Sequence, residues 1–233
     1  MDYSLSSLTD VARQYIKDQI LSGTLKCGDK VIETEVSQAL QISRAPVREA
    51  FRSLDEQGIL THSPRRGHVV WEIPRDELFE IFQIRISLEL HVLRLLITHQ
   101  LLTPVDFNRL EQFIHQMETG DATPQTDSER VFLLNSLDIA FHKYLWDASQ
   151  NKRHAKMLES LFYQLLIAMN VNVDSLGSYK EKAEEHRIML RSLKSGDTNK
   201  LCKDFKAHLQ KYINAAMGSL SRAETRTLNA LYD

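Results

Sequence analysis

The stretch SRAPVREAFRSLDEQG, residues 43–58, constrains the fold most, because its two helical faces differ in chemistry. Ser43 is a good helix N-cap, and Pro46 falls in the first turn, where its missing N–H costs little. An apolar stripe recurs at steps of three and four residues beside an arginine stripe at steps of four: Val47, Ala50, Phe51 and Leu54, and Arg44, Arg48 and Arg52. One face is therefore expected to pack against a core and the other to meet an anion.

A basic hairpin is expected directly after this helix. Gly58 is a natural helix stop, and ILTHSPRRGHVVWEI reads as two short strands around a turn at residues 64–67. Upstream, residues 11–22 and 34–40 carry two further short helical patterns. The order helix, helix, helix, hairpin is that of a winged helix-turn-helix. A solvated, charge-bearing surface helix would also show an arginine stripe, but it would not explain the preceding helix and the basic hairpin.

The segment from Val11 to Val70 resembles the DNA-binding domain of the GntR family of bacterial transcription regulators. The matching residues are Gly23, Gly28, the run 43–50, Leu54, Gly58, and Arg66 with Gly67. The expected contacts with double-stranded DNA are Ser43, Arg44, Ala45, Arg48, Arg52, Arg65, Arg66, Gly67 and His68. His68 can be interpreted equally well as a DNA contact or as a solvated residue of the hairpin. One small winged helix offers little surface for specificity, so we expect a homodimer that reads a palindromic operator.

Composition limits the other possibilities. A chain of 233 residues that is 42% hydrophobic can bury two cores, so two domains are expected. The formal net charge of -2 excludes a protein that coats nucleic acid by bulk electrostatics, so binding must rely on local basic groups. Cys27 and Cys202 match no metal or redox spacing and are expected to be reduced thiols. No apolar run is long enough to cross a bilayer, and a cytoplasmic protein with no membrane partner is expected.

From Asp76 onward the pattern is helical, with little that continues a β pattern after Pro74. Helices are predicted at 76–98, 103–118, 128–149, 152–173, 179–195 and 198–219. The chain is thus expected to be mainly α. A winged helix-turn-helix in residues 1–73 is followed by an all-α helical bundle in residues 77–220 and by a polar C-terminal tail in residues 221–233. The resemblance to the GntR family implies that the bundle serves for effector binding and dimerisation.

Four polar residues fall on core-facing stripes of the predicted bundle. Asp138 and His142 lie at i and i+4 on one helix, and His186 and His208 share their stripes with apolar residues of two others. Buried polar groups need partners, and one divalent cation can satisfy all four. Any one of these histidines alone would be interpreted as a hydrogen-bonded core residue. As a set, they resemble the metal site of the FCD ligand-binding domain, found in the FadR-type branch of the GntR family. The resemblance spans about residues 77–219. Zinc is the expected ion, while nickel, manganese and iron also suit such a site.

Arg85 falls on the apolar stripe of the helix predicted at 76–98. A buried guanidinium requires an anionic partner. One candidate is Glu89, four residues on, in an intrahelical pair. The other is the carboxylate of an effector, as the family resemblance implies. The sequence leaves both open.

The expected function is a DNA-binding transcription regulator, a repressor and not an enzyme, whose operator affinity is controlled by a small organic acid bound at the metal site. A metal-dependent hydrolase is the alternative from another class, because a site of three histidines and one carboxylate can activate water. No residue stands out as a general base beside the ligands, and an enzyme has no use for the DNA-binding domain. A third possibility is a metal sensor, in which the cation itself is the signal.

Overall fold

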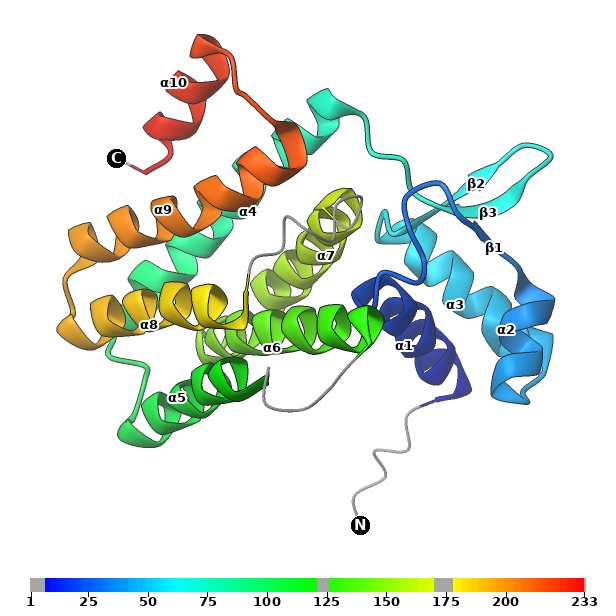
Figure 1. Ribbon diagram of the computed structural model, residues 1–233, viewed down its shortest axis with the longest axis horizontal. Helices are drawn as coiled ribbons and strands as arrows, with labels where there is room; N and C mark the ends of the chain where they lie inside the picture. The colour runs from blue at the N-terminus through cyan, green and yellow to red at the C-terminus, as the bar shows by residue number, and fades with distance from the viewer. Residues whose placement is uncertain (1–6, 121–125, 170–177, 233) are drawn as a thin grey trace.

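The N-terminal elements form a winged helix-turn-helix, as predicted. The structure is a computed structural model that describes residues 7–120, 126–169 and 178–232. Its first elements are α1 (Leu8–Leu21), β1 (Lys30–Val31), α2 (Glu33–Leu40), α3 (Arg44–Glu56), β2 (Leu60–Ser63) and β3 (Gly67–Val70). The strands form an antiparallel sheet in the order β1-β3-β2, and the β2–β3 hairpin projects from the molecule as the wing (Figure 1).

The rest of the chain is helical, which confirms the mainly-α fold class. The helices are α4 (Arg75–Thr98), α5 (Pro104–Thr119), α6 (Asp127–Ala148), α7 (Lys152–Met169), α8 (Tyr179–Ser195), α9 (Thr198–Met217) and α10 (Arg222–Ala230). The ends of α4, α5, α6, α8 and α9 lie within two residues of their predicted bounds. The last part of the helix predicted at 152–173 lies outside the described residues. Among the described residues, no helix is both long and apolar enough to span a lipid bilayer.

The two faces of the stretch 43–58 separate in the structure as predicted. Val47, Phe51 and Leu54 are buried, and α3 packs by this face against α1, where Ile16 and Ile20 are also buried. Each of these side chains contributes about 1.5–3 kcal/mol when it is removed from water. The arginines of α3 remain exposed, so the packing fixes which side of the helix faces outward.

Three local expectations require correction. The connector after α1 contains β1, whose Lys30 pairs with Val69 of β3, a long-range pairing that no local periodicity indicates. The segment expected as a polar tail contains α10, which begins with a capping box of Ser221 and Glu224 and buries Leu228. Ser43 has the extended backbone of an N-cap, but its side chain makes no capping hydrogen bond.

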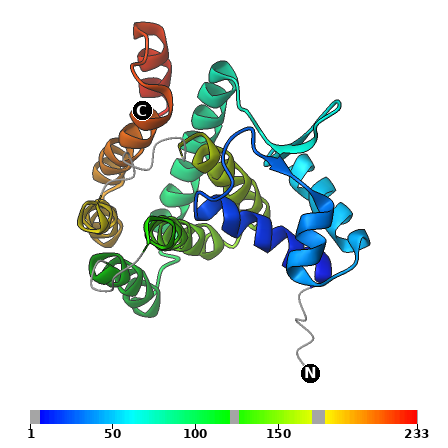
Figure 2. The same ribbon diagram turned by 45° about the vertical axis from the view of Figure 1, so that its right-hand side comes forward.

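The DNA-binding elements lie directly against the helical domain. Helix α1 packs on α6 and α7, while the wing points away from them (Figures 1 and 2). The buried Asn135 of α6 donates its amide N–H to the Leu21 carbonyl at the end of α1, at 2.8 Å. Ser160 and Gln164 of α7 both donate to the carbonyl of Gln57, the C-cap of α3, at 2.8 and 2.7 Å. Both of these helix ends are therefore held by polar side chains of the second domain.

Candidate metal centre and nucleic-acid interface

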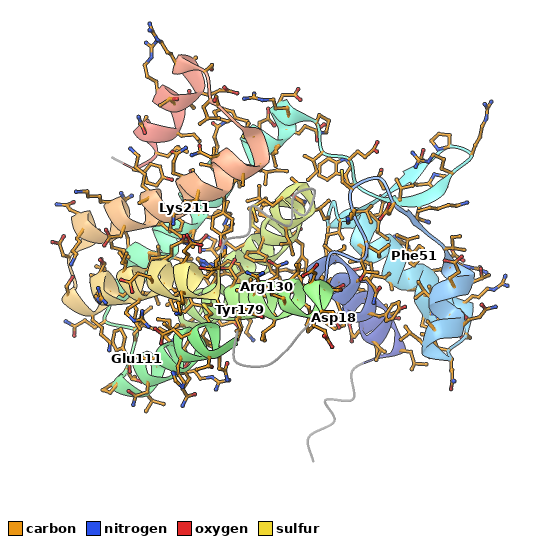
Figure 3. All side chains as sticks on the ribbon, in the orientation of Figure 1. Asp18, Phe51, Glu111, Arg130, Tyr179 and Lys211 are labelled. Carbon is orange, nitrogen blue, oxygen red and sulfur yellow. The ribbon has the colours of Figure 1, made fainter. Side chains whose placement is uncertain are left out.

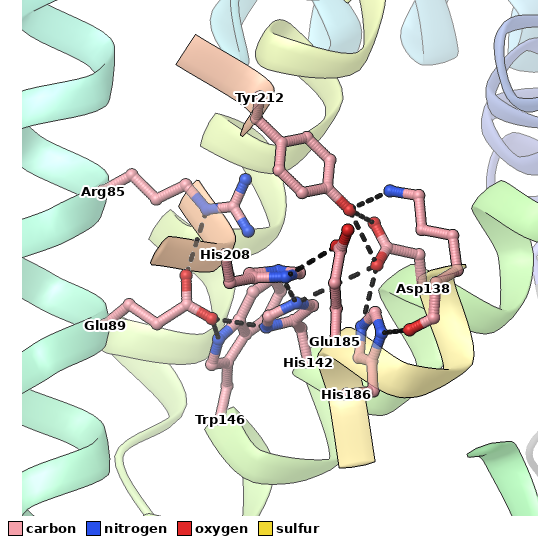
Figure 4. A network of polar contacts seen from close by, with 10 residues as sticks. Arg85, Glu89, Asp138, His142, Trp146, Glu185, His186, His208 and Tyr212 are labelled. Carbon is pink, nitrogen blue, oxygen red and sulfur yellow. Dashed lines mark hydrogen bonds and ion pairs between the residues drawn. The ribbon is translucent and has the colours of Figure 1, made fainter. Parts of the chain in front are cut away.

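The four predicted ligands meet in the core of the helical domain. Asp138 and His142 come from α6, His186 from α8 and His208 from α9, and all four are buried (Figure 4). Their donor atoms lie within 4.8 Å of one another. Ligands placed about 2.0–2.2 Å from one ion are separated by roughly 3–4.4 Å, so the arrangement is close to that of a coordination sphere.

His142 and His186 each have a hydrogen-bond acceptor at Nδ1, and His208 has a carboxylate at ion-pair distance from its Nδ1. These contacts are His142 Nδ1 to Glu89 Oε1 at 2.6 Å, His186 Nδ1 to the Lys182 carbonyl at 2.7 Å, and His208 Nδ1 to Glu185 Oε2 at 3.2 Å. A carboxylate or a carbonyl can only accept, so the neutral ring carries its proton on Nδ1 and a lone pair on Nε2. Acceptors of this kind commonly orient histidine ligands of metals.

The Nε2 atoms point toward one another and toward the carboxylate. His142 Nε2 lies 3.2 Å from His208 Nε2, and His186 Nε2 lies 2.9 Å from Asp138 Oδ1. With protons on Nδ1, these are contacts between acceptors. His186 Nε2 has no hydrogen-bond partner among the described residues despite complete burial. Buried acceptors without donors are costly, and a cation between them would remove the cost.

The protonation states suit ligation. Burial lowers the pKa of His208 to about 3, outweighing the opposing effect of Glu185, so the ring is neutral at pH 7. Burial by itself would raise the pKa of Asp138, but the positive charge around it, that of Lys182 foremost, holds the pKa well below its usual value, and the carboxylate stays ionised. A neutral imidazole and an ionised carboxylate are the ligand forms that metals require.

Sequence reasoning missed the residues that surround the cluster. Tyr212 donates its hydroxyl to both Asp138 oxygens, at 3.0 and 3.1 Å, and accepts a hydrogen bond from the Lys182 ammonium. Tyr212 lies four residues after His208, and Lys182 four residues before His186. A search for i, i+4 neighbours of the predicted ligands would have found both. Glu89 and Glu185 place carboxylate oxygens against the imidazole rings of His142 and His208.

Arg85 and Glu89 form the intrahelical pair that the sequence allowed. Arg85 Nε donates to Glu89 Oε2 at 3.0 Å, and both side chains are almost fully buried. Trp146 Nε1 donates to the other Glu89 oxygen at 3.1 Å. Burial would raise the pKa of Glu89, but its contacts with His142 and Arg85 outweigh this and lower the pKa to about 2. Arg85 Nη2 is buried and has no hydrogen-bond partner among the described residues. Pairing through Nε therefore leaves the Nη2 amino group of the guanidinium available.

The predicted DNA-binding residues lie on the outer side of α3 and on the wing. Arg44, Arg48 and Arg52 are all exposed. Arg48 Nε lies 3.1 Å from Glu33 of α2, and Arg52 Nε lies 3.3 Å from Glu56. Ser43 and Ala45 are exposed at the start of α3. Side chains project into open space from this helix and from the wing, while Phe51 lies between them (Figure 3).

The wing turn holds its two arginines in different ways. Arg65 is exposed and has a left-handed backbone with φ of 68°, and Gly67 follows with φ of 79°. Arg66 donates from Nη2 to the Gly28 carbonyl at 3.0 Å. His68 is half-buried, with its ring edge-on to Phe51 at a centroid distance of 5.0 Å. His68 is therefore a packing contact between the wing and α3.

Comparison with known proteins identifies the family of the chain. Residues 8–70 match the family described as bacterial regulatory proteins, gntR family, and residues 80–211 match the FCD domain. The chain belongs to the GntR family and carries an FCD domain. It is therefore a transcription regulator, and the two families it matches are families of regulators and not of enzymes.

Relatives in the GntR family resemble the chain over most of its length. It is 27% identical to the HTH-type transcriptional regulator McbR of Escherichia coli, covering 82% of this chain and 84% of McbR. It is 25% identical to a protein of Paenarthrobacter nicotinovorans named "Probable D-xylose utilization operon transcriptional repressor", covering 92% and 91%. The solved structure of E. coli McbR/YncC superimposes with a TM-score of 0.75 at 22% identity, covering 98% of this chain and 100% of that one. A GntR regulator from Rhodococcus gives 0.70 at 21% identity, covering 95% and 98%. These structures show a shared fold.

Proposed function

We propose that this GntR-family protein is a homodimeric repressor acting in the cytoplasm, and that a small organic acid bound at a metal ion in the FCD domain controls its affinity for operator DNA. The observation that carries the proposal is the buried cluster of acceptor atoms around Asp138, which a cation would satisfy and which lies in the domain that packs against the DNA-binding elements.

Asp138, His142, His186 and His208 would hold the ion. The supporting observation is that each Nδ1 faces an acceptor while the Nε2 atoms converge. Three nitrogens and one oxygen fit zinc, with nickel, manganese and iron as alternatives. Such an ion, when bound with one or two open coordination positions, offers them to an anionic oxygen ligand.

Arg85 would provide a second anchor for the acid. Its Nε is occupied by Glu89, but the buried Nη2 lacks a partner among the described residues. An unsatisfied buried donor costs about 1–3 kcal/mol, and a carboxylate oxygen would satisfy it. The two interpretations of Arg85 are thus compatible, because different nitrogens of the guanidinium serve them.

Double-stranded DNA would be bound by α3 and the wing, through Ser43, Arg44, Ala45, Arg48, Arg52, Arg65, Arg66 and Gly67, with His68 supporting the wing. The exposed arginines of α3 suit the major groove, where arginine reads guanine. Two such domains in a dimer would read the two halves of a palindrome.

Helix α6 would connect the two sites. Asn135 holds the end of α1, and Asp138 follows it one helical turn later on the same helix. An acid that prefers one position of α6 would shift the position of α1 and, through it, of α3. A ligand that binds both arrangements equally would shift nothing. We propose that the acid-bound arrangement releases DNA.

The test is a titration of sugar acids, hydroxy acids, dicarboxylates and fatty acids against the protein–operator complex, followed by fluorescence anisotropy. We expect at least one acid to lower operator affinity in the wild-type protein and to lose this effect in Arg85→Ala and in His186→Ala/His208→Ala. The matched control is Arg191→Ala, an exposed arginine of α8 whose side chain is 61% accessible. An acid response that survives both changes would show that the sensor lies elsewhere. A response to metal alone, without any acid, would favour the metal sensor.

A further inference from the structure

Helix α10 is held to the rest of the chain by few side chains. It is nine residues long, and an isolated helix of fewer than about 12 residues is marginal in water. Leu228 is its only buried residue, and the side chains on either side of it, at Thr227 and Asn229, are exposed. A segment that buries so little apolar surface opens at a low cost in free energy and leaves the other helices folded.

The chain turns at Gly218 and brings α10 back over the helical domain. Gly218 is the C-cap of α9 and has a φ of 68°, a left-handed value that favours glycine. Near the start of α10, Glu224 contacts Arg75 in the first turn of α4, at 2.6 Å. Helix α10 therefore follows α9 after a short turn and touches α4 with its own first turn (Figures 1 and 2).

Tyr232, two residues after the end of α10, contacts both of these helices. Its carbonyl accepts a hydrogen bond from Arg94 Nη2 of α4 at 3.4 Å, and its ring centroid lies 5.3 Å from the Lys206 ammonium of α9. The same Arg94 nitrogen lies 3.6 Å from Cys202 Sγ of α9. The half-buried Tyr232 side chain packs against the hydrophobic core. Tyr232 thus lies at the seam where α4 and α9 adjoin.

The proposed effector site lies between the same two helices. Arg85 and Glu89 project from α4 toward His208 and Tyr212 of α9 (Figure 4). Burial raises the pKa of the Tyr232 hydroxyl, and the positive charge of Arg85, the second influence, lowers it. This hydroxyl therefore lies within electrostatic reach of the guanidinium whose Nη2 has no hydrogen-bond partner among the described residues.

We propose that α10 is a hinged cover over the effector site, and that Tyr232 closes the seam between α4 and α9 beside Arg85. A small acid enters through this seam when α10 moves away about the turn at Gly218, and it is shielded from water when α10 returns. The hinge, the weak attachment and the closing side chain all lie in residues 218–232. The inference rests on the proposed function for the nature of the ligand, whereas the movement of α10 is a property of the free protein.

The first test measures access to the site without any ligand. Trp146 is fully buried and donates to Glu89, so its fluorescence in a Trp71→Phe background reports on a quencher that reaches the site. Leu228→Asp places a charge at the buried anchor of α10, and we expect it to raise the rate constant for acrylamide quenching of Trp146 severalfold. The matched control is Asn229→Asp, which adds the same charge at the exposed neighbouring position.

Hydrogen exchange completes this test. In the wild type, the amides of α10 should exchange faster than those of α9, and Leu228→Asp should speed exchange in α10 alone. Circular dichroism checks that the other helices remain folded. Amides of α10 that are protected as well as those of α9 would overturn the hinged cover. Rapid exchange of α10 in Leu228→Asp together with unchanged quenching of Trp146 would overturn it as well.

The second test isolates the closing side chain. Tyr232→Ala keeps Leu228 and the pair between Arg75 and Glu224, and it should still raise the quenching of Trp146 because the seam is left unfilled. Tyr232→Phe retains the ring and should behave as the wild type does. Equal quenching in these two variants and in the wild type would overturn the role of Tyr232.

The third test connects the cover with the proposed metal site. Release of zinc from the zinc-loaded protein to EDTA should be at least about tenfold faster in Leu228→Asp than in Asn229→Asp, with the same zinc content at saturation. A protein that takes up no zinc would overturn the metal site of the proposed function, and the quenching results would still decide the cover. Equal rates of zinc release in the two variants would overturn the seam as the route into the site.

Discussion

Lys17 of α1 and Glu159 of α7 form an ion pair of 3.1 Å across the boundary between the DNA-binding elements and the FCD domain. The other oxygen of Glu159 lies 3.0 Å from Lys143 of α6, and the Lys17 ammonium lies 4.4 Å from the centroid of the Tyr163 ring. The Lys17 side chain is only 10% exposed. A buried ammonium without its carboxylate is costly, so this pair ties the position of α1 to that of α7.

The first prediction concerns this pair. Replacing Glu159 by Gln leaves Lys17 with a weaker partner and should lower the free energy of unfolding by about 1–3 kcal/mol at neutral pH. The measurement is urea unfolding monitored by circular dichroism. Glu184→Gln, on the surface of α8, provides the control. Equal stability of Glu159→Gln and wild type would show that the pair does not stabilise the fold.

The same variant has a predictable pH dependence. Burial raises the pKa of Glu159, but Lys17 and Lys143 outweigh this and place it below its usual value of 4.5. A carboxyl whose folded-state pKa is lowered stabilises the fold above its unfolded pKa and loses that contribution as the pH falls through the folded pKa. The stability difference between wild type and Glu159→Gln should therefore shrink as the pH falls below about 4.5. A difference that grows on acidification would contradict this sign.

A third prediction concerns the recognition helix. Arg44→Ala and Arg48→Ala should each weaken operator binding by about 1–3 kcal/mol where the arginine reads a base, and specificity should relax at that base pair. Loss of a phosphate contact would instead weaken binding to all sequences alike. Fluorescence anisotropy with operator and with single-base variants separates the two. If both variants bind operator DNA normally, α3 is not part of the DNA-binding interface.

Glu33 should act against DNA binding. It lies 3.1 Å from Arg48 in the free protein and carries a negative charge toward the proposed phosphate surface. Exposed pairs of this kind contribute about 0.2–1 kcal/mol, so Glu33→Gln should increase operator affinity by up to roughly fivefold at low salt. The gain should decrease as salt concentration rises. Weaker binding by Glu33→Gln would mean that the pair positions Arg48 productively.

The last prediction concerns the metal. His186→Ala/His208→Ala should lose bound metal, measured by elemental analysis, and should unfold at a lower temperature, because two ligands and their cation are removed from a helical core. A chelator should lower the melting temperature of wild type and leave that of the double variant unchanged. Unchanged metal content in the double variant would disprove the assignment of these ligands.

The sequence by itself determined those features that depend on neighbours along one helix. The two faces of α3 follow from apolar and basic residues at fixed steps, and the pairing of Asp138 with His142 follows from their i, i+4 spacing. The possible Arg85–Glu89 pair could be identified for the same reason. Helical periodicity places such residues on one face whatever surrounds them.

Only the tertiary structure decided the features that join distant segments. Pairing of β1 with β3 links residues far apart in sequence, and a strand of two residues has no periodicity of its own. Helix α10 buries Leu228 and pairs Glu224 with Arg75 of α4 at 2.6 Å, and His142 contacts Glu89 from another helix. Hydrogen bonds and ion pairs require positions accurate to a few tenths of an ångström. Those positions arise only when the helices have packed.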